Sequence, residues 1–158
     1  MRHSILVACL IFFGTIAGIE NGLLKVTCDM AQAIELARLY HKPFLVVFLG
    51  GPMSEEGGRV LTLLKSKEMD RRLESPVPVF FADLNFQLFS SAELINYQVL
   101  VEQMQIQQFP SVVMINGQNQ ELLRLTGSQI DLDPLTSKIA QANYRELSLR
   151  QELIEIPH

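Results

Sequence analysis

The side chains best able to do chemistry in this chain are its two cysteines, because a thiolate can attack a disulfide sulfur. Cys9 lies in an apolar run near the N-terminus, and Cys28 precedes a helical pattern. If the segment around Cys9 is removed as a leader, Cys28 is left alone, and one thiol cannot form an intramolecular disulfide. Two alternatives stay open for Cys28: a small packed side chain, or a thiol that reacts with a partner.

The segment from Gly50 to Gly58, Gly-Gly-Pro-Met-Ser-Glu-Glu-Gly-Gly, is the second candidate for chemistry. Glycines before a helix let backbone N–H groups approach a phosphate. However, Glu55 and Glu56 stand where the anion would bind, and they suit the positive end of the helix dipole themselves. The segment also has no lysine, which a P-loop requires. We therefore expect no phosphate site here.

Ser54, in the same segment, is a conceivable nucleophile only if a base lies beside it. The three histidines are scattered at His3, His41 and His158. No group of His, Cys, Asp and Glu has the spacing of metal ligands. We therefore expect no catalytic serine, no metal and no cofactor.

Length and charge restrict the remaining classes of function. A chain of 158 residues suits one compact domain. The net charge is -4 and acidic and basic residues are interspersed, so no basic stripe exists to bind a phosphate backbone. We expect no nucleic-acid partner.

The N-terminus has the three parts of a secretory signal. A basic start, residues 1–4, precedes the apolar run 5–13, and small residues follow as far as Ala17 and Gly18. We expect a signal peptide at 1–18, cleaved near Ala17 or Gly18, and a single domain at 19–158. The protein is then exported, to the periplasm or cell envelope, and contacts a membrane only if this segment is not cleaved.

The hydrophobic pattern predicts alternating strands and helices. Strands are expected at 23–26, 44–49, 77–82, 111–115 and 121–125. Helices are expected after an Asp29 cap, across 60–74, from Ser90 or Ser91 to Met104 with Ala92, Ile95 and Val99 on its apolar face, and after an Asp133 cap. Helices between the early strands favour parallel crossovers, and the final hairpin adds antiparallel strands.

Several short motifs, taken in order, resemble the thioredoxin-like fold family. They are His41-Lys42-Pro43, Ala82-Asp83-Leu84-Asn85, Phe109-Pro110-Ser111, Asn116-Gly117 and Leu125-Thr126-Gly127. Together they span most of the chain after the leader. The resemblance implies an α/β fold with a mixed central β-sheet and helices on both faces.

The chain departs from this family at its redox motif, because no Cys-x-x-Cys follows the second strand. Two alignments place the lost cysteines at Ser54 and Gly57, or at Met53 and Glu56. Without a thiolate the family's thiol–disulfide exchange cannot proceed, so we expect no oxidoreductase activity from this loop. The stretch between Asp83 and Pro110 is also longer than in thioredoxins.

The resemblance further implies a cis Phe109–Pro110 bond opposite the loop, with the backbone of Phe109 turned outward to pair with an extended peptide. The leading hypothesis is therefore a non-catalytic module that binds a peptide or partner protein. The candidate residues are Phe109, Pro110, Gly51, Pro52, Met53, Phe86 and Phe89. The plainer alternative is that Pro110 only starts a strand and Phe109 fills the core.

Two other functions stay open. A redox accessory protein would act through Cys28 or beside a catalytic relative. A structural subunit of an envelope complex would bind its partner through the C-terminal segment, with Leu147, Leu153 and Ile156.

Overall fold

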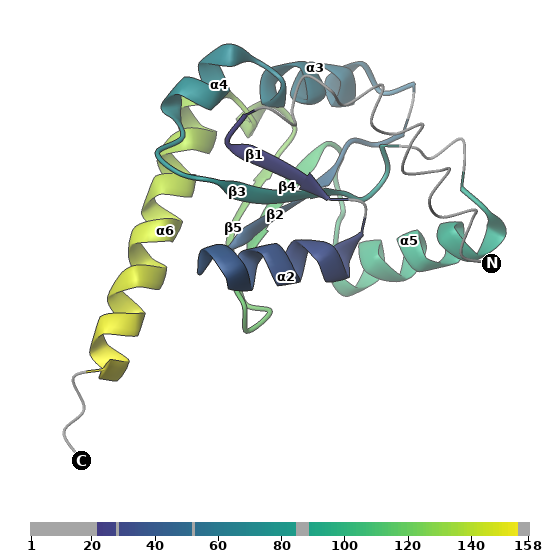
Figure 1. Cartoon of the computed structure of the whole chain (residues 1–158). Coiled ribbons are helices and arrows are strands. Elements are labelled where there is room, and N and C mark those ends of the chain that lie inside the picture. Colours follow the sequence, from purple (N-terminus) through teal and green to yellow (C-terminus); the bar gives the residue numbers. More distant parts are fainter. Residues whose placement is uncertain (1–21, 28, 52, 85–88, 155–158) are drawn as a thin grey trace.

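The computed structural model describes residues 22–27, 29–51, 53–84 and 89–154. Its centre is a five-stranded sheet in the order β1-β3-β2-β4-β5. The strands are β1 (Leu24–Thr27), β2 (Phe44–Phe48), β3 (Val77–Phe81), β4 (Ser111–Ile115) and β5 (Glu121–Thr126). β1, β3 and β2 run parallel, while β4 is antiparallel to both β2 and β5 (Figure 1). The expected mixed sheet is confirmed.

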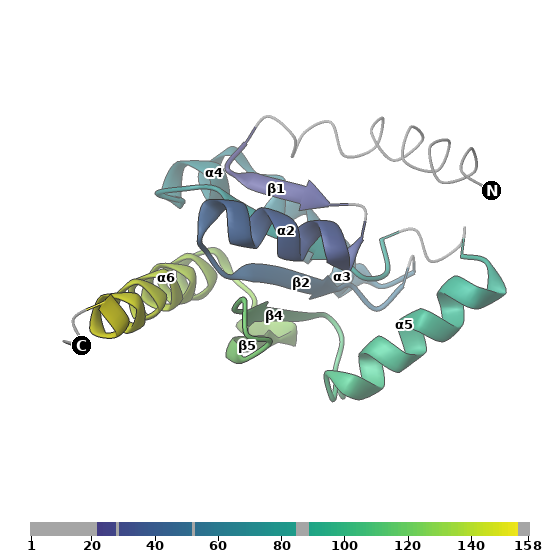
Figure 2. The same ribbon diagram turned by 60° about the horizontal axis from the view of Figure 1, so that its bottom comes forward.

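Helices cover both faces of the sheet, as expected (Figure 2). The helices are α2 (Met30–Tyr40), α3 (Glu55–Leu64), α4 (Lys67–Arg72), α5 (Ser91–Gln103) and α6 (Leu132–Ile154). Side chains of α3, α4 and α6 share one core cluster, and those of α2 and α5 pack against the other. Among the described residues, no helix combines the length and the apolar character that crossing a bilayer requires.

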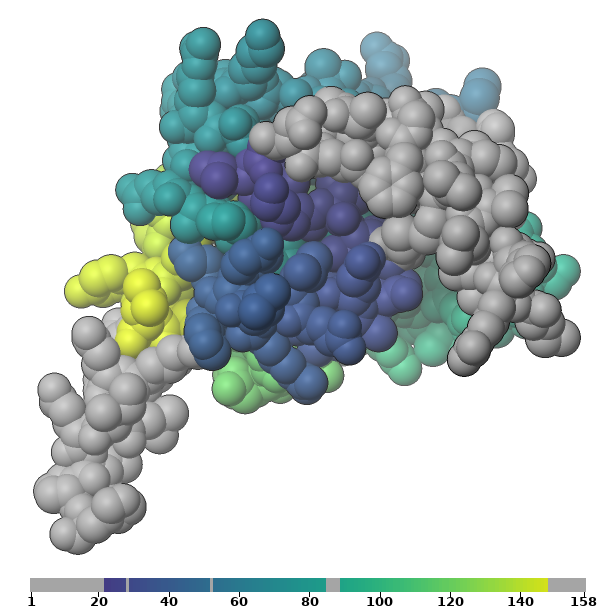
Figure 3. Space-filling model, viewed as in Figure 1, coloured from purple at the N-terminus to yellow at the C-terminus, as the bar shows by residue number. Residues whose placement is uncertain are grey.

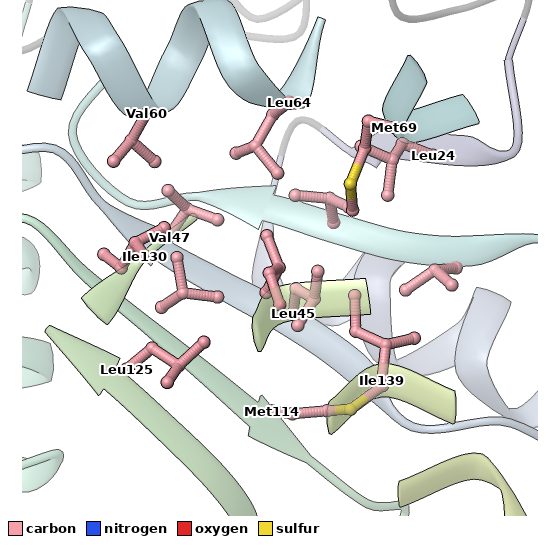
Figure 4. Close-up of a cluster of buried hydrophobic side chains, with 14 of the residues drawn as sticks. Leu24, Leu45, Val47, Val60, Leu64, Met69, Met114, Leu125, Ile130 and Ile139 are labelled. Atoms are coloured by element: carbon pink, nitrogen blue, oxygen red, sulfur yellow. The ribbon is translucent and has the colours of Figure 1, made fainter. Parts of the chain in front are cut away.

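Strand β2 forms the centre of both cores because successive side chains of a strand point to opposite faces. Leu45 and Val47 join the cluster under α3, α4 and α6, shown in Figure 4. Phe44, Val46 and Phe48 join the cluster under α2. All five are fully buried, which confirms the prediction of a central strand from an unbroken apolar run.

The predicted helix across 60–74 is wrong, because the structure has two helices there. α3 starts earlier, at Glu55, and ends at Leu64. The Ser66 hydroxyl then accepts a hydrogen bond from the Met69 N–H at 3.0 Å and caps α4. A serine at an N-cap satisfies a backbone donor that the helix itself leaves free.

The last helix also begins earlier than predicted. The Asp131 carboxylate accepts a hydrogen bond from the Leu132 N–H at 2.8 Å, and α6 starts at Leu132. Asp133, the predicted cap, lies in the first turn.

The predicted apolar face of α5 is partly wrong. Ile95 and Val99 are exposed, while Tyr97, Leu100 and Met104 pack against the core. No residue of α5 is fully buried. Its N-cap is Ser90, one of the two predicted caps.

Candidate functional site

The loop in the place of the redox motif is held by its backbone. After β2, the N–H groups of Leu49 and Gly50 each donate to the Asp83 carboxylate at 2.7 Å, and that of Gly51 donates at 3.1 Å. Gly50 and Gly51 have φ angles of +90° and +87°, a conformation that side chains with a Cβ rarely adopt. The two glycines thus allow three consecutive N–H groups to turn toward one carboxylate.

Asp83 lies at the carboxyl end of β3, next to β2, and is 2% exposed. Three backbone donors satisfy its charge where water cannot, and hydrogen bonds of this kind to a carboxylate are stronger than neutral ones. In the sequence, Asp83 belongs to a strand-end motif that indicated no functional role for it. A single acid directly after a buried apolar strand was the available signal.

Tyr97 of α5 completes this anchor. Its hydroxyl donates to Asp83 Oδ2 at 3.3 Å, and its ring packs against Phe48 and Phe89 with centroids 6.3 Å and 6.1 Å away. Burial of the ring, followed by the adjacent Asp83 charge, raises the pKa of the Tyr97 hydroxyl. The hydroxyl is therefore a donor at neutral pH, and it ties α5 to the loop.

Ser54 serves as a helix cap. Its hydroxyl oxygen accepts a hydrogen bond from the Gly57 N–H at 2.9 Å, which starts α3. His41, the histidine within the described residues, ends α2 before β2 begins. The five residues of β2 span about 16 Å, which separates that imidazole from the Ser54 end of the strand. The Ser54 hydroxyl thus has no histidine base within the described part of the chain.

Gly57, the other position aligned with a lost cysteine, is a packing glycine. A Cβ placed there would lie 2.2 Å from the carbonyl oxygen of Leu49. α3 therefore approaches the end of β2 too closely for any side chain at this position. Gly58, the next residue, borders open space, and a Cβ placed there would have nothing within 4 Å.

Phe109 lies across the loop from Ser54. A Cβ on Gly50 would come within 2.8 Å of the Phe109 Cβ and 3.4 Å of the Ser54 hydroxyl oxygen. The Phe109–Pro110 peptide bond is cis, and Pro110 is buried while Phe109 is 40% exposed. The side chain of Phe109 therefore does not fill the core, and it is partly open to solvent beside the loop.

The backbone of Phe109 is also available. Gln108 C=O accepts from the Ser111 hydroxyl at 2.6 Å, and Pro110 C=O accepts from the Gly127 N–H at 2.9 Å. Between them, neither the N–H nor the C=O of Phe109 has a hydrogen-bond partner within the described residues. A backbone donor and acceptor on one partly exposed residue can pair with an extended chain.

The remaining candidate residues are distributed as follows. Met53 is 92% exposed on the loop, Gly51 is half-buried, and Phe89 packs against Tyr97. Pro52, Phe86, Cys28 and the expected signal peptide at 1–18 lie outside the described residues. In the part of the chain that the structure covers, no three metal-ligating side chains come together.

The strand that precedes Cys28 ends on the same side of the sheet as the loop. Thr27 ends β1 level with Phe80 of β3, and Val46 of β2 is level with the same residue. β1 and β2 are two strand spacings apart, about 10 Å. β1 therefore ends near the same edge of the sheet as the loop, and Gly50 follows four residues after Val46.

The sequence matches no protein-family profile and no curated protein. Solved structures do match. The DsbH oxidoreductase has a TM-score of 0.63 at 20% identity, covering 76% of this chain and 85% of that one. A thioredoxin from Thermus thermophilus has a TM-score of 0.61 at 17% identity, covering 85% and 98%.

The oxidised C-terminal domain of DsbD from Neisseria meningitidis is also similar, with a TM-score of 0.55 at 13% identity and coverage of 71% and 90%. These identities are low, so the similarity concerns the fold. The strand order, the helices on both faces and these structural matches agree with one another: this chain is a protein of the thioredoxin-like fold.

Proposed function

We propose that this chain is a binding module of the thioredoxin-like fold without thiol chemistry, which holds an extended peptide segment at Phe109 and the facing loop. The proposal rests on one observation: the N–H and C=O of Phe109 have no partner among the described residues, while the carbonyls on both sides are bonded. A peptide that lies alongside Phe109 gains main-chain hydrogen bonds as in strand addition.

Two apolar side chains give this surface its chemistry. Phe109 is partly exposed, and Met53 projects from the loop that contacts it. Methionine adapts to differently shaped partners, and aromatic rings supply large contact area. The preferred ligand is therefore an extended segment with apolar side chains, bound with little demand for one sequence.

The loop is suited to holding such a ligand because Asp83 fixes its backbone through three N–H groups. A preorganised surface loses less conformational entropy on binding. Residues 1–18 have the composition of a secretory signal, so we place this activity outside the cytoplasm.

A peptide array tests the proposal. The purified chain is applied to immobilised peptides of systematically varied apolar content. We expect binding to apolar extended peptides, loss of binding in Phe109→Asp, and retention in Phe109→Tyr. Leu39→Asp is the matched control, because Leu39 is an exposed apolar residue on α2. Equal binding by wild type and Phe109→Asp would reject the site.

The redox-accessory alternative predicts a different result. A partner bound through Cys28 would be captured as a mixed disulfide, released by reductant and absent in Cys28→Ser. Peptide binding at Phe109 is unchanged by that substitution under the main proposal.

A further inference from the structure

The strand pairing that joins the two sides of the peptide site stops short of the site itself. β2 and β4 are paired as far as Phe48 and Ser111. The loop follows Phe48, and Phe109 precedes Ser111, so both sides of the site extend past the last pair. Among the described residues, no hydrogen bond joins residues 50–54 directly to residues 108–110. A connection outside the sheet therefore helps to set the separation of the two sides.

This connection runs through Gly127, which contacts both neighbours of Phe109. The Gly127 N–H donates to the Pro110 carbonyl at 2.9 Å. A Cβ placed on Gly127 would lie 2.8 Å from Nε2 of Gln108, so the Gln108 side chain lies directly against this glycine. Gly127 has a φ angle of +51°, which suits a residue without a Cβ. The position of Gly127 therefore restrains the residues on both sides of Phe109.

Arg59 holds Gly127 from the helix that follows the loop. Gly127 begins the short 3₁₀ helix η2 (Gly127–Gln129), and Arg59 lies in the second turn of α3. The Arg59 guanidinium donates to the Gly127 carbonyl at 3.2 Å and to the Ile130 carbonyl at 2.8 Å. Val60, next to Arg59, and Ile130 both point into the buried cluster of Figure 4, so packing also holds α3 against this turn.

Glu56 orients the guanidinium of Arg59. Its carboxylate, one turn earlier on the same helix, accepts from Arg59 Nε at 3.1 Å. The rigid, planar guanidinium can thus serve a carboxylate and two carbonyls at once, which a lysine ammonium cannot do in the same geometry. Charged hydrogen bonds of this kind are stronger than neutral ones. The Arg59 side chain is 40% exposed, however, so solvent screens its charge and its effect on global stability is small.

Ser54 completes this brace because it belongs to both the loop and α3. Its hydroxyl caps the helix, and a Cβ placed on Gly50 would lie 3.4 Å from that hydroxyl oxygen. The loop is thus attached to the start of α3, while Arg59 attaches the next turn of α3 to Gly127. One helix therefore holds both the loop and residues 108–110.

We propose that Arg59 is a positioning residue of the peptide site, which acts through Gly127 and does not itself contact the peptide. This inference rests on the proposed function. With Arg59 in place, residues 108–110 stand at a set separation from the loop, and the peptide meets a surface that is already ordered. Without Arg59, the turn at Gly127 must be ordered when the peptide binds, and that entropic cost weakens binding.

Fluorescence anisotropy with a fluorescein-labelled peptide of alternating leucine and serine residues measures the effect. We expect Arg59→Met to weaken binding about threefold to tenfold. Arg59→Lys, which keeps the charge and can reach one carbonyl, should recover part of the loss. Hydrogen exchange at the Gly127 amide should become faster in Arg59→Met. The denaturant midpoint of each variant is measured as well, so that affinity and stability are compared separately.

Arg72→Met is the matched control. The Arg72 side chain is 42% exposed and is paired with Glu68 and Asp133, so the two arginines have similar surroundings. Its helix, α4, lies beside the start of α6, at the edge of the molecule away from α5 (Figures 1 and 3). We expect Arg72→Met to lower the denaturant midpoint by a similar amount, and to leave both the peptide affinity and the exchange of the Gly127 amide unchanged.

Glu56→Gln is a milder test of the same brace, because the probe peptide carries no charged side chain and Glu56 acts on it only through Arg59. We expect this substitution to weaken binding about twofold in the wild-type background and to have no effect beside Arg59→Met. If Arg59→Met does not fold, Arg59→Lys and Glu56→Gln decide the question. Unchanged affinity in both of these variants then overturns the inference.

The failure of this inference can be distinguished from the failure of the proposed function. Unchanged affinity in Arg59→Met, an equal loss of affinity in Arg72→Met, or an effect of Glu56→Gln that persists beside Arg59→Met overturns the inference alone. A wild type that binds the peptide no better than Phe109→Asp rejects the proposed function, and this inference with it.

Discussion

Asp83 holds Gly50 by its backbone, with the carboxylate Oδ2 accepting the Gly50 N–H at 2.7 Å. The same oxygen receives the Gly51 N–H, while Oδ1 receives that of Leu49. Gly50 in turn lies so close to the Cβ of Phe109 that no side chain would fit at position 50. One buried acid therefore sets the path of the loop and the surface against which Phe109 packs.

Replacing Asp83 by asparagine should loosen this loop. The amide NH2 would face backbone N–H donors, so one or more buried donors would lose an acceptor, at a cost of about 1–3 kcal/mol in the free energy of unfolding. Urea unfolding measures the cost, and hydrogen exchange at the Gly50 and Gly51 amides localises it. Glu102→Gln, which removes an exposed charge on α5, is the control. It should change neither the free energy of unfolding nor the hydrogen exchange of the Gly50 and Gly51 amides. Unchanged exchange at Gly50 would show that Asp83 does not hold the loop.

Neighbouring glycines of α3 should respond to alanine with opposite signs. At Gly57 a Cβ would lie 2.2 Å from the Leu49 carbonyl oxygen, so Gly57→Ala forces backbone shifts that cost about 1–3 kcal/mol. At Gly58 nothing lies within 4 Å, so Gly58→Ala stabilises the helix by about 0.5–1 kcal/mol. The denaturant midpoints of the two variants, each compared with wild type, test both expectations. Equal stabilisation by both would contradict the close approach of α3 to β2.

The same clash limits any attempt to restore the redox motif. Ser54→Cys with Gly57→Cys places a Cβ against the Leu49 carbonyl and removes the cap of α3, so we expect a less stable protein. Met53→Cys with Glu56→Cys uses two exposed positions and should leave the unfolding midpoint nearly unchanged. Comparing the two midpoints under reducing conditions tests this. A well-folded Ser54 and Gly57 double variant would refute the steric argument.

The strands were predictable because their apolar runs are unambiguous, as at β2, and the cap of α2 was predictable from Asp29. The break at Ser66 was not, since Leu61, Leu64 and Leu73 fit one helical pattern although a cap interrupts it. A serine within a helical pattern of apolar residues can lie inside one helix or can cap the next helix. Which of the two occurs depends on how the chain turns in three dimensions.

The candidate site was predictable only in outline. Motif order pointed to Phe109 and the loop, but the path of the loop is set by Asp83, which lies 33 residues beyond Gly50 in sequence. The face of α5 was misjudged for a similar reason. Tyr97 turns inward because its hydroxyl meets Asp83 and its ring meets Phe48, and neither contact is visible in a local pattern.

High pH should weaken the fold through Tyr97. Burial first, and then the Asp83 charge, raises the pKa of its hydroxyl above the ordinary value of 10.0. The folded protein then binds a proton that the unfolded chain releases, so the contribution is complete below pH 10 and is lost as the pH rises beyond it. Urea midpoints from pH 8 to 11 should fall more steeply in wild type than in Tyr97→Phe. Parallel profiles would show that the hydroxyl is solvated.

Arg124 of β5 should hold the C-terminal end of α5 in place. It should thereby also help to position Phe109, which follows this helix. Its guanidinium donates to the Met104 carbonyl at 2.7 Å while Glu121 orients it through two hydrogen bonds of 2.9 and 2.6 Å. Because no residue of α5 is fully buried, this contact adds to the Tyr97 anchor in attaching the helix.

Arg124→Lys keeps the charge but loses the planar fork that reaches both groups. We expect faster hydrogen exchange in the last turn of α5, a change of less than about 1 kcal/mol in global stability, and weaker peptide binding at Phe109. Arg38→Lys on α2 is the matched control, since Arg38 is exposed. Unaltered exchange at Val101 and Met104 would show that packing alone holds α5, and the arginine would then be dispensable.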